Sequence, residues 1–276
     1  RIESVFEVTS GMADGSVKEV TAKEEQPAVE FKNVSLTYSG SGAPSVEGIN
    51  FKAMKGQTIG VIGGTGSGKS SLVNLIPRLY DVTQGEVLVD GVNVKDYDIE
   101  TLRNKVGIVM QKAVLFKGTI RENMWMGKKG ATDEQIDEAL EISQSKEFVD
   151  SKEGRLDYPI EQGGKNLSGG QRQRLTIARA IVRKPDVLIL DDSASALDFA
   201  TDAALRKAIR GMNNSPTVFI VSQRAASLMY ADLIIVLDDG QVAGMGTHDE
   251  LLANCEVYKE IYESQFKKAD SEGGVA

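Results

Sequence analysis

The first patterned part of the chain has apolar residues in alternation with polar ones. This pattern covers residues 29–36, and a turn rich in Gly, Ser and Pro at 39–45 separates it from a second apolar run at 49–53. Alternation with a period of two, interrupted by a turn, predicts an antiparallel β element. Residues 9–27 are polar and contain few large apolar side chains, which predicts a linker.

Farther along the chain, short apolar runs alternate with segments of helical spacing. Residues 57–62 are mostly apolar and lead into glycines, and residues 70–80 then place apolar side chains three and four positions apart. A strand, a Gly-rich turn and a helix in this order open a βαβ unit. The same criteria predict strands at 87–89, 106–110, 187–191, 218–222 and 233–237 and helices at 132–150, 172–183, 201–213 and 249–268.

Composition restricts the class of protein. The 276 residues are 41% apolar and 26% charged, as in ordinary globular proteins. The 32 Lys and Arg residues against 40 Asp and Glu residues give a net charge of −8, which argues against a nucleic-acid partner. No run of about 18 apolar residues is present to span a membrane.

Cysteine and histidine occur once each, and each single residue excludes a class of site. The single cysteine, Cys255, rules out an intrachain disulfide and favours a reduced, cytosolic setting. The single histidine, His248, rules out His-rich metal sites and is expected beside the start of the last helix.

A glycine-rich loop follows the predicted strand at 57–62. It matches G-x-x-x-x-G-K-[ST] between a predicted strand and a predicted helix, which is the context that this phosphate-binding motif requires. Glycines let backbone N–H groups turn toward a polyphosphate, and the helix N-terminus adds positive potential. The alternative is an ordinary Gly-rich connection. We predict a nucleotide site made by the loop and the residue after it: Gly63, Gly64, Thr65, Gly66, Ser67, Gly68, Lys69, Ser70 and Ser71.

Three side chains are expected to hold ATP with Mg²⁺ at this loop. Lys69 would reach the β- and γ-phosphates, and the Ser70 hydroxyl would ligate Mg²⁺. The apolar run 187–191 ends in Asp191, whose carboxylate would reach the ion through water. Alone, that run is better explained as a core strand with a polar end, and the loop is what favours the functional interpretation. The predicted fold is α/β, with a P-loop NTPase core and a mainly parallel sheet.

Residues 167–171 read Leu-Ser-Gly-Gly-Gln and precede a basic helix, about 20 residues ahead of the acidic strand end. Together with the loop, this sequence resembles the nucleotide-binding domain of ABC transporters, whose signature motif it matches at every position. The stretch from Thr101 to Asn123 resembles exporter domains more than importer domains. The resemblance covers roughly residues 28–265.

The resemblance implies roles for further residues. Tyr38 resembles the aromatic residue that stacks on adenine, although a single aromatic could also be a plain strand residue. Gln111 resembles the Q-loop residue, a further Mg²⁺ ligand, and residues Ser195 to Asp198 resemble the D-loop. Residues 161–165 lie where exporters carry a loop that senses the transmembrane part. In the family two domains pack head to tail, so the partner's nucleotide would meet Ser168, Gly169, Gly170 and Gln171.

The same resemblance divides the chain into three parts. Residues 28–268 are expected to form the nucleotide-binding domain, with an N-terminal antiparallel β subdomain and a helical subdomain inserted at about 112–180. Residues 1–27 would link it to a preceding transmembrane region, and residues 269–276 would be a tail. We therefore expect a fragment of a longer half-transporter at the cytoplasmic face of the cell membrane.

Two positions depart from the family pattern, and both concern hydrolysis. Asp192 stands where the family usually has the Glu that serves as general base, and its carboxylate is one methylene shorter. Gln223 stands where the family usually has His, and an amide cannot carry a proton or a positive charge. Both residues are nevertheless candidates for the catalytic positions. With an intact signature, they indicate a heterodimer in which this chain hydrolyses ATP weakly and completes the partner's site.

Three alternatives remain open from the sequence. Asp192 and Gln223 could be tolerated variants in a working site. The domain could be a regulatory module that binds ATP and locks a dimer without hydrolysis. It could also be a soluble ABC-type ATPase, although no coiled-coil insertion or second cassette supports that interpretation.

Overall fold

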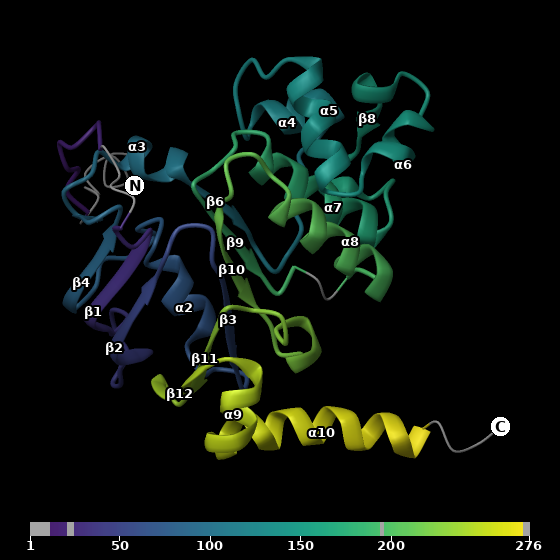
Figure 1. Ribbon diagram of the computed structural model, residues 1–276. Helices are drawn as coiled ribbons and strands as arrows, with labels where there is room; N and C mark the ends of the chain where they lie inside the picture. Colours follow the sequence, from purple (N-terminus) through teal and green to yellow (C-terminus); the bar gives the residue numbers. More distant parts are fainter. Residues whose placement is uncertain (1–11, 21–24, 194–195, 273–276) are drawn as a thin grey trace.

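The computed structural model describes residues 12–20, 25–193 and 196–272. Two main β-sheets lie side by side, and a group of helices extends from the larger one (Figure 1). This arrangement confirms the predicted α/β class, with an antiparallel β subdomain, a mainly parallel central sheet and an inserted helical part.

The smaller sheet is antiparallel throughout, as the alternating pattern predicted. Its strand order is β2-β1-β4-β5. Phe31 and Phe51 stack between neighbouring strands with ring centroids 4.5 Å apart, and Phe51 also contacts Phe219 of the central sheet at 6.2 Å. The two sheets therefore share one core. The strands are β1 (Val29–Leu36), β2 (Val46–Ala53), β4 (Gln84–Val89) and β5 (Val92–Asn93).

The central sheet has the order β12-β11-β3-β10-β9-β6. All its neighbouring pairs are parallel except β11 with β12. Because successive side chains in a strand point to opposite faces, Leu188 and Leu190 pack in one core while Val187 and Ile189 pack in the other. The strands are β3 (Thr58–Gly63), β6 (Val106–Val109), β9 (Val187–Asp191), β10 (Thr217–Val221), β11 (Leu233–Asp238) and β12 (Gln241–Gly246).

Helices cover both faces of this sheet. Helix α2 (Lys69–Asn74) lies between the two sheets, where Leu72 and Val73 are fully buried. Helix α8 (Phe199–Arg210) packs Leu205 and Ile209 into the core on the other face. The remaining helices of this part are α3 (Ile99–Lys105), α9 (His248–Asn254) and α10 (Glu256–Glu272).

The inserted helical part forms around α7 (Gly169–Ile181), the longest of its helices. Leu140 and Leu175 are fully buried there. Trp125 donates a hydrogen bond to the carbonyl oxygen of Ala131 at 3.0 Å, so its indole closes a turn within this part. The other elements are α4 (Ile120–Trp125), α5 (Asp133–Ile142), α6 (Lys146–Asp150) and the two-residue strands β7 (Gly118–Thr119) and β8 (Pro159–Ile160).

Several predicted boundaries were wrong. The helix expected at 70–80 ends at Asn74, three residues before Pro77, because proline disfavours helical backbone in the residue before it. The helix expected at 249–268 is two helices that meet at Cys255, which has extended backbone. His248 begins α9, as expected, and its Nδ1 lies 2.7 Å from the hydroxyl oxygen of buried Tyr258.

Part of the predicted linker packs against the domain. The N–H of Gly15 donates to the carbonyl oxygen of Tyr97 at 3.1 Å, and the N–H of Asp98 donates to that of Val17 at 3.0 Å. The Asp14 carboxylate accepts from the N–H of Ile99 at the start of α3. Residues 1–11 and 21–24 of the linker lie outside the described residues. Across the described ranges, no helix has the length and apolar character needed to cross a membrane.

Candidate nucleotide-binding site

The predicted site residues meet at one edge of the central sheet. The Gly-rich loop follows β3, Gln223 follows β10, Asp191 ends β9, and Gln111 follows β6. These four strands are consecutive in the sheet and parallel, so their C-terminal ends lie together. Ligands of open α/β sheets bind at this edge.

Glycine is required at both ends of the loop. Gly63 and Gly68 have φ values of 157° and 93°. A Cβ atom would lie 2.1 Å from the carbonyl oxygen of Leu237 at Gly63, and 2.3 Å from that of Ser45 at Gly68. Neither oxygen can move away cheaply because both are backbone atoms. The glycines therefore allow the loop to lie tightly against neighbouring chain.

A hollow of about 180 Å³ lies over the loop and the start of α2. Residue Ser45, which the sequence did not indicate, contributes to its wall. Its only sequence signal is its place as the last residue of the turn at 39–45. The hollow is lined by Ser45, Gly66, Gly68, Lys69, Ser70 and Ser71.

Lys69 is buried and points back into its own loop. Its amine donates to the carbonyl oxygens of Gly63 at 2.8 Å and Gly64 at 2.5 Å. Burial lowers the pKa of this amine, and the negative charges of Asp191 and Asp192 raise it in opposition. A buried cation beside two carboxylates is well placed to exchange those carbonyls for phosphate oxygens.

Ser70 and Asp191, two of the three predicted Mg²⁺ ligands, are brought together. The Ser70 hydroxyl donates to Oδ1 of Asp191 at 3.2 Å. Burial raises the pKa of the Asp191 carboxyl, the Ser70 bond lowers it, and the charge of Asp192 raises it. A hydroxyl and a carboxylate oxygen are ligands that Mg²⁺ prefers, and a bound cation would offset the cost of burying this carboxylate. The residues present therefore fit a magnesium ion.

Asp192 contacts Gln111, the candidate Q-loop residue, and does not line the hollow. The Gln111 amide donates to its Oδ2 at 3.1 Å. The backbone of Asp192 is left-handed, with φ 45°, and the N–H of Asp192 donates to the carbonyl oxygen of Val221 at 2.9 Å. The two candidates for metal binding and base catalysis are thus paired with each other.

Gln223, the second departure, lies in an exposed segment after β10. Its backbone carbonyl accepts a hydrogen bond from Nε2 of Gln265 in α10 at 2.7 Å. The sequence did not point to Gln265, because it lies 42 positions away on an ordinary polar helix position.

Tyr38, the candidate adenine-stacking residue, lies beside the loop. Its hydroxyl donates to Oγ of Ser71 at 3.0 Å. Its ring meets Tyr80 edge to face, with centroids 4.9 Å apart. Tyr38 is therefore fixed within reach of the first turn of α2, and Tyr80 is a second aromatic residue there that the sequence did not single out.

The signature residues form the N-terminus of α7. Ser168 is the N-cap: its Oγ accepts from the N–H of Gln171 at 3.2 Å, and the Gln171 side chain accepts from the N–H of Ser168 at 3.1 Å. Gly169 is exposed. None of the described residues that line the hollow over the loop comes from 168–171.

The D-loop candidate lies next to the signature. A Cβ atom at Gly170 would lie 3.3 Å from the carbonyl oxygen of Ala196. Asp198 is the N-cap of α8, and its carboxylate accepts from the N–H of Thr201 at 2.9 Å. Ser195, the first residue of the predicted D-loop, lies outside the described residues.

Comparison with known proteins agrees with this geometry. A family model described as ABC transporter matches residues 46–195, and the chain belongs to the ABC transporter family. An uncharacterized ABC transporter ATP-binding protein of Mycobacterium tuberculosis is 43% identical over 250 residues, which are 90% of this chain and 42% of that protein. A Staphylococcus aureus protein, provisionally named a multidrug export ATP-binding/permease protein, is 39% identical over 241 residues, 87% of this chain and 42% of that protein.

A solved structure supports the same conclusion. A bacterial Atm1-family ABC exporter with ATP bound superposes with a TM-score of 0.88 and 30% identity, covering 95% of this chain and 46% of that one. The chain thus spans less than half the length of each of these proteins. It corresponds to a nucleotide-binding domain of the exporter type.

Proposed function

We propose that this chain is the ATP-binding motor domain of a heterodimeric ABC exporter. It binds ATP with Mg²⁺ at the loop over β3, hydrolyses it weakly and supplies its signature to the site of a different partner chain. The observation that carries this proposal is the set of binding side chains at one sheet edge, next to a hydrolytic pair, Asp192 and Gln223, that departs from the family.

Binding uses groups that are already in place. Lys69 leaves the carbonyls of its own loop and pairs with the β- and γ-phosphates. The N–H groups at the start of α2 face the phosphates, and Tyr38 provides a surface for the adenine ring. Ser70 and Asp191 would hold Mg²⁺, with Gln111 as a further ligand. When bound, the ion neutralises phosphate charge.

Hydrolysis is expected to be slow for two reasons. The Asp192 carboxylate is short and already accepts a hydrogen bond from Gln111, which holds it away from an attacking water. A base that is out of hydrogen-bond reach forfeits a rate factor of about 10²–10⁴. Gln223 can hydrogen-bond a γ-phosphate but cannot carry the positive charge that a histidine could.

The signature faces outward and is chemically intact. Ser168 and the glycines after it can present hydroxyl and N–H donors to a γ-phosphate held by the partner. In this arrangement the partner's site performs the turnover. The transmembrane domains of the same half-transporter then convert dimer closure into export from the cytoplasmic face of the membrane.

The proposal is tested first on the chain itself. Calorimetric titration should show binding of ATP with Mg²⁺, and a phosphate-release assay should show little turnover. ATPase activity at the rate of an ordinary exporter would contradict a degenerate site. In a complex with the partner, disabling the partner's general base then separates the alternatives. Complete loss of ATPase assigns a regulatory role to this chain's own site, and residual ATPase assigns weak hydrolysis to it.

A further inference from the structure

The Gln265 side chain of α10 binds the backbone on both sides of Arg224. Its Nε2 donates to the carbonyl oxygen of Gln223 at 2.7 Å, and its Oε1 accepts from the N–H of Ala225 at 2.9 Å. One amide therefore satisfies two backbone groups that lie two residues apart. The pair of bonds fixes the backbone from which the Gln223 side chain extends.

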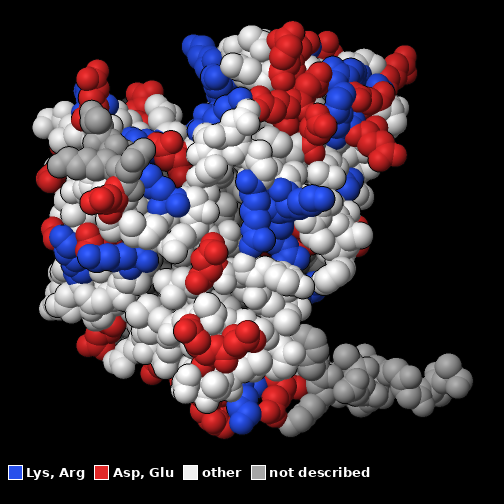
Figure 2. All heavy atoms as spheres, viewed as in Figure 1, with Lys and Arg blue, Asp and Glu red and all other residues white. Residues whose placement is uncertain are grey.

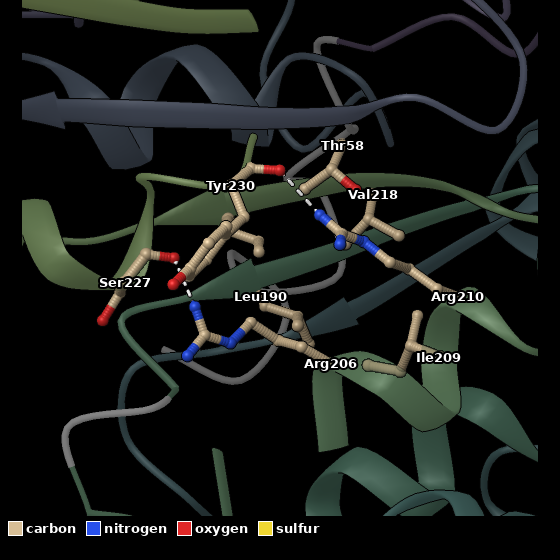
Figure 3. Close-up of a pocket in the computed structure, with 9 residues that line it drawn as sticks. Thr58, Leu190, Arg206, Ile209, Arg210, Val218, Ser227 and Tyr230 are labelled. Carbon is tan, nitrogen blue, oxygen red and sulfur yellow. Dashed lines mark hydrogen bonds between the residues drawn. The ribbon is translucent and has the colours of Figure 1, made fainter. Parts of the chain in front are cut away.

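Helix α8 holds the continuation of the same segment. Arg206 donates to the carbonyl oxygen of Ser227 at 2.8 Å, and Arg210 donates to that of Tyr230 at 2.6 Å (Figure 3). Basic side chains gather over α8 in Figure 2, and Arg206, Lys207 and Arg210 line a groove there. Arg206 also forms an ion pair with Asp202 of the same helix at 2.7 Å, so its charge is already paired within the domain.

Residues 223–230 are thus attached to two helices by bonds to backbone atoms. The α8 bonds begin at Ser227, whereas the Gln265 bonds include the carbonyl of Gln223 itself. At the start of the segment, the N–H of Arg224 donates to Oγ of Ser222, which precedes the segment, at 2.9 Å. Of these contacts, the one from Gln265 is made to Gln223, the residue proposed to hydrogen-bond the γ-phosphate.

We infer that Gln265 is a positioning residue that fixes the place of Gln223 relative to the γ-phosphate. The inference rests on the proposed function, in which the Gln223 amide contacts that phosphate. Positioning matters because a hydrogen bond weakens steeply when its distance or angle changes. The α- and β-phosphates are held by the loop at 63–70, to which Gln265 makes no hydrogen bond among the described contacts. Loss of the Gln265 side chain should therefore weaken the binding of ATP and leave the binding of ADP unchanged.

The test compares affinities for ATP and ADP, each with Mg²⁺, by calorimetric titration of the 276-residue chain. Gln265→Ala should weaken ATP binding by about three- to tenfold, the cost of one hydrogen bond to the γ-phosphate. ADP affinity should stay within about twofold, which also shows that the variant is folded. Ser264→Ala is the matched control on the same helix, because among the described residues its hydroxyl donates only to the carbonyl oxygen of Ile261.

Gln265→Glu separates the two bonds. A carboxylate can still accept from the N–H of Ala225, but it cannot donate to the carbonyl of Gln223. It should therefore lose ATP affinity at least as strongly as Gln265→Ala, again without a change for ADP. Equal losses for ATP and ADP in both variants would assign Gln265 a purely structural role and overturn the inference.

A double-mutant cycle with Gln223→Ala completes the design. If Gln265 acts through Gln223, the double variant should bind ATP as weakly as Gln223→Ala alone. Additive losses would overturn the inference, and so would an unchanged ATP-to-ADP ratio in Gln223→Ala. These outcomes are distinct from failure of the proposed function, which would appear as no ATP binding by the unmodified chain.

Discussion

The starts of α2 and α7 are both assigned to phosphates, yet they are built in opposite ways. Helix α2 begins after Gly68, whose left-handed backbone, φ 93°, offers no side chain to cap the first turn. Helix α7 begins at Ser168, which exchanges two hydrogen bonds with Gln171 in a capping box. One helix start therefore leaves its N–H groups to a ligand, and the other satisfies two of them internally.

This difference agrees with the proposal that each terminus provides a different half of a nucleotide site. The uncapped start of α2 lies beside a buried lysine and a buried carboxylate. An anion bound with its metal ion should therefore stabilise this start more than the start of α7. The capped start of α7 is stable without ligand and is exposed at Gly169. A terminus of that kind remains folded at the surface without a ligand, and in the proposed dimer the second domain would bring the phosphate to it.

The largest expected effect is at α2. Lys69→Ala removes the charge that pairs with the β- and γ-phosphates, and ATP affinity should fall by at least about 100-fold. Thermal melting with and without MgATP measures this, since ligand at 100 times its Kd stabilises by about 2.7 kcal/mol. Exposed Lys129→Ala is the control and should keep the full thermal shift. A Lys69→Ala variant that retains the shift would remove the distinction between the two helix starts.

The next effect concerns the signature. Gly169→Asp should reduce hydrolysis at the partner's site by at least about 100-fold, because unit charges 4 Å apart repel by about 4 kcal/mol at an effective dielectric of 20. Ser168→Ala should damage the same site to a smaller extent. Trapping of labelled nucleotide in a complex with the partner shows which site is lost.

Gly169→Ala is the matched control for the charge. Among the described residues outside the backbone of its own helix, the nearest atom to a Cβ at this position is Arg172 Nη2 at 4.0 Å, so the methyl group should be tolerated. If Gly169→Asp instead abolished nucleotide trapping at this chain's own site and left the partner's site intact, the head-to-tail arrangement would be contradicted.

A smaller effect is expected from repair of the hydrolytic pair beside α2. Asp192→Glu with Gln223→His should raise hydrolysis of this chain's own nucleotide by about 10- to 100-fold, because the longer carboxylate reaches the water and the imidazole helps to align it. Each single change should do less, since the two groups act together. The assay is ATPase activity of the complex with the partner's general base disabled. No rise, with an intact signature on the partner, would show that these side chains do not limit the site.

The smallest effect tests the capping box. Ser168→Ala should lower the stability of the folded chain by about 1 kcal/mol, or about 2–4 °C in melting temperature for a chain of this size. Ser264→Ala, which removes a hydroxyl outside any helix cap, is the control. An unchanged melting temperature would mean that the start of α7 is not stabilised by its own side chains.

The binding half of the site was predictable because its signals are local. An apolar run, a glycine loop and Lys69 with Ser70 lie within 14 consecutive positions, from 57 to 70. Parallel strands then place Asp191 and Gln111 at the same edge without further information. The contact between Gln111 and Asp192 was not predictable, because it depends on how two loops after different strands approach each other.

The misses in the fold have the same origin. Strand β12 has glycines at positions 244 and 246 and lacks an apolar run, so its pairing with β11 gives it its structure. Gln265 resembles any polar helix residue until the fold places it against Gln223. The packing of Gly15 to Val17 on residues 96–98, directly before α3, was hidden by polar composition that is typical of a linker.

The buried amine of Lys69 has a consequence for the heat of nucleotide binding. Because it already donates to Gly63 and Gly64, binding replaces one set of hydrogen bonds by another and does not create a set from none. The enthalpy measured for this lysine is then a difference between carbonyl and phosphate partners. The hydrogen bonds from Lys69 to Gly63 and Gly64 keep the loop folded when no nucleotide is bound, so little ordering entropy remains to be lost when ATP arrives.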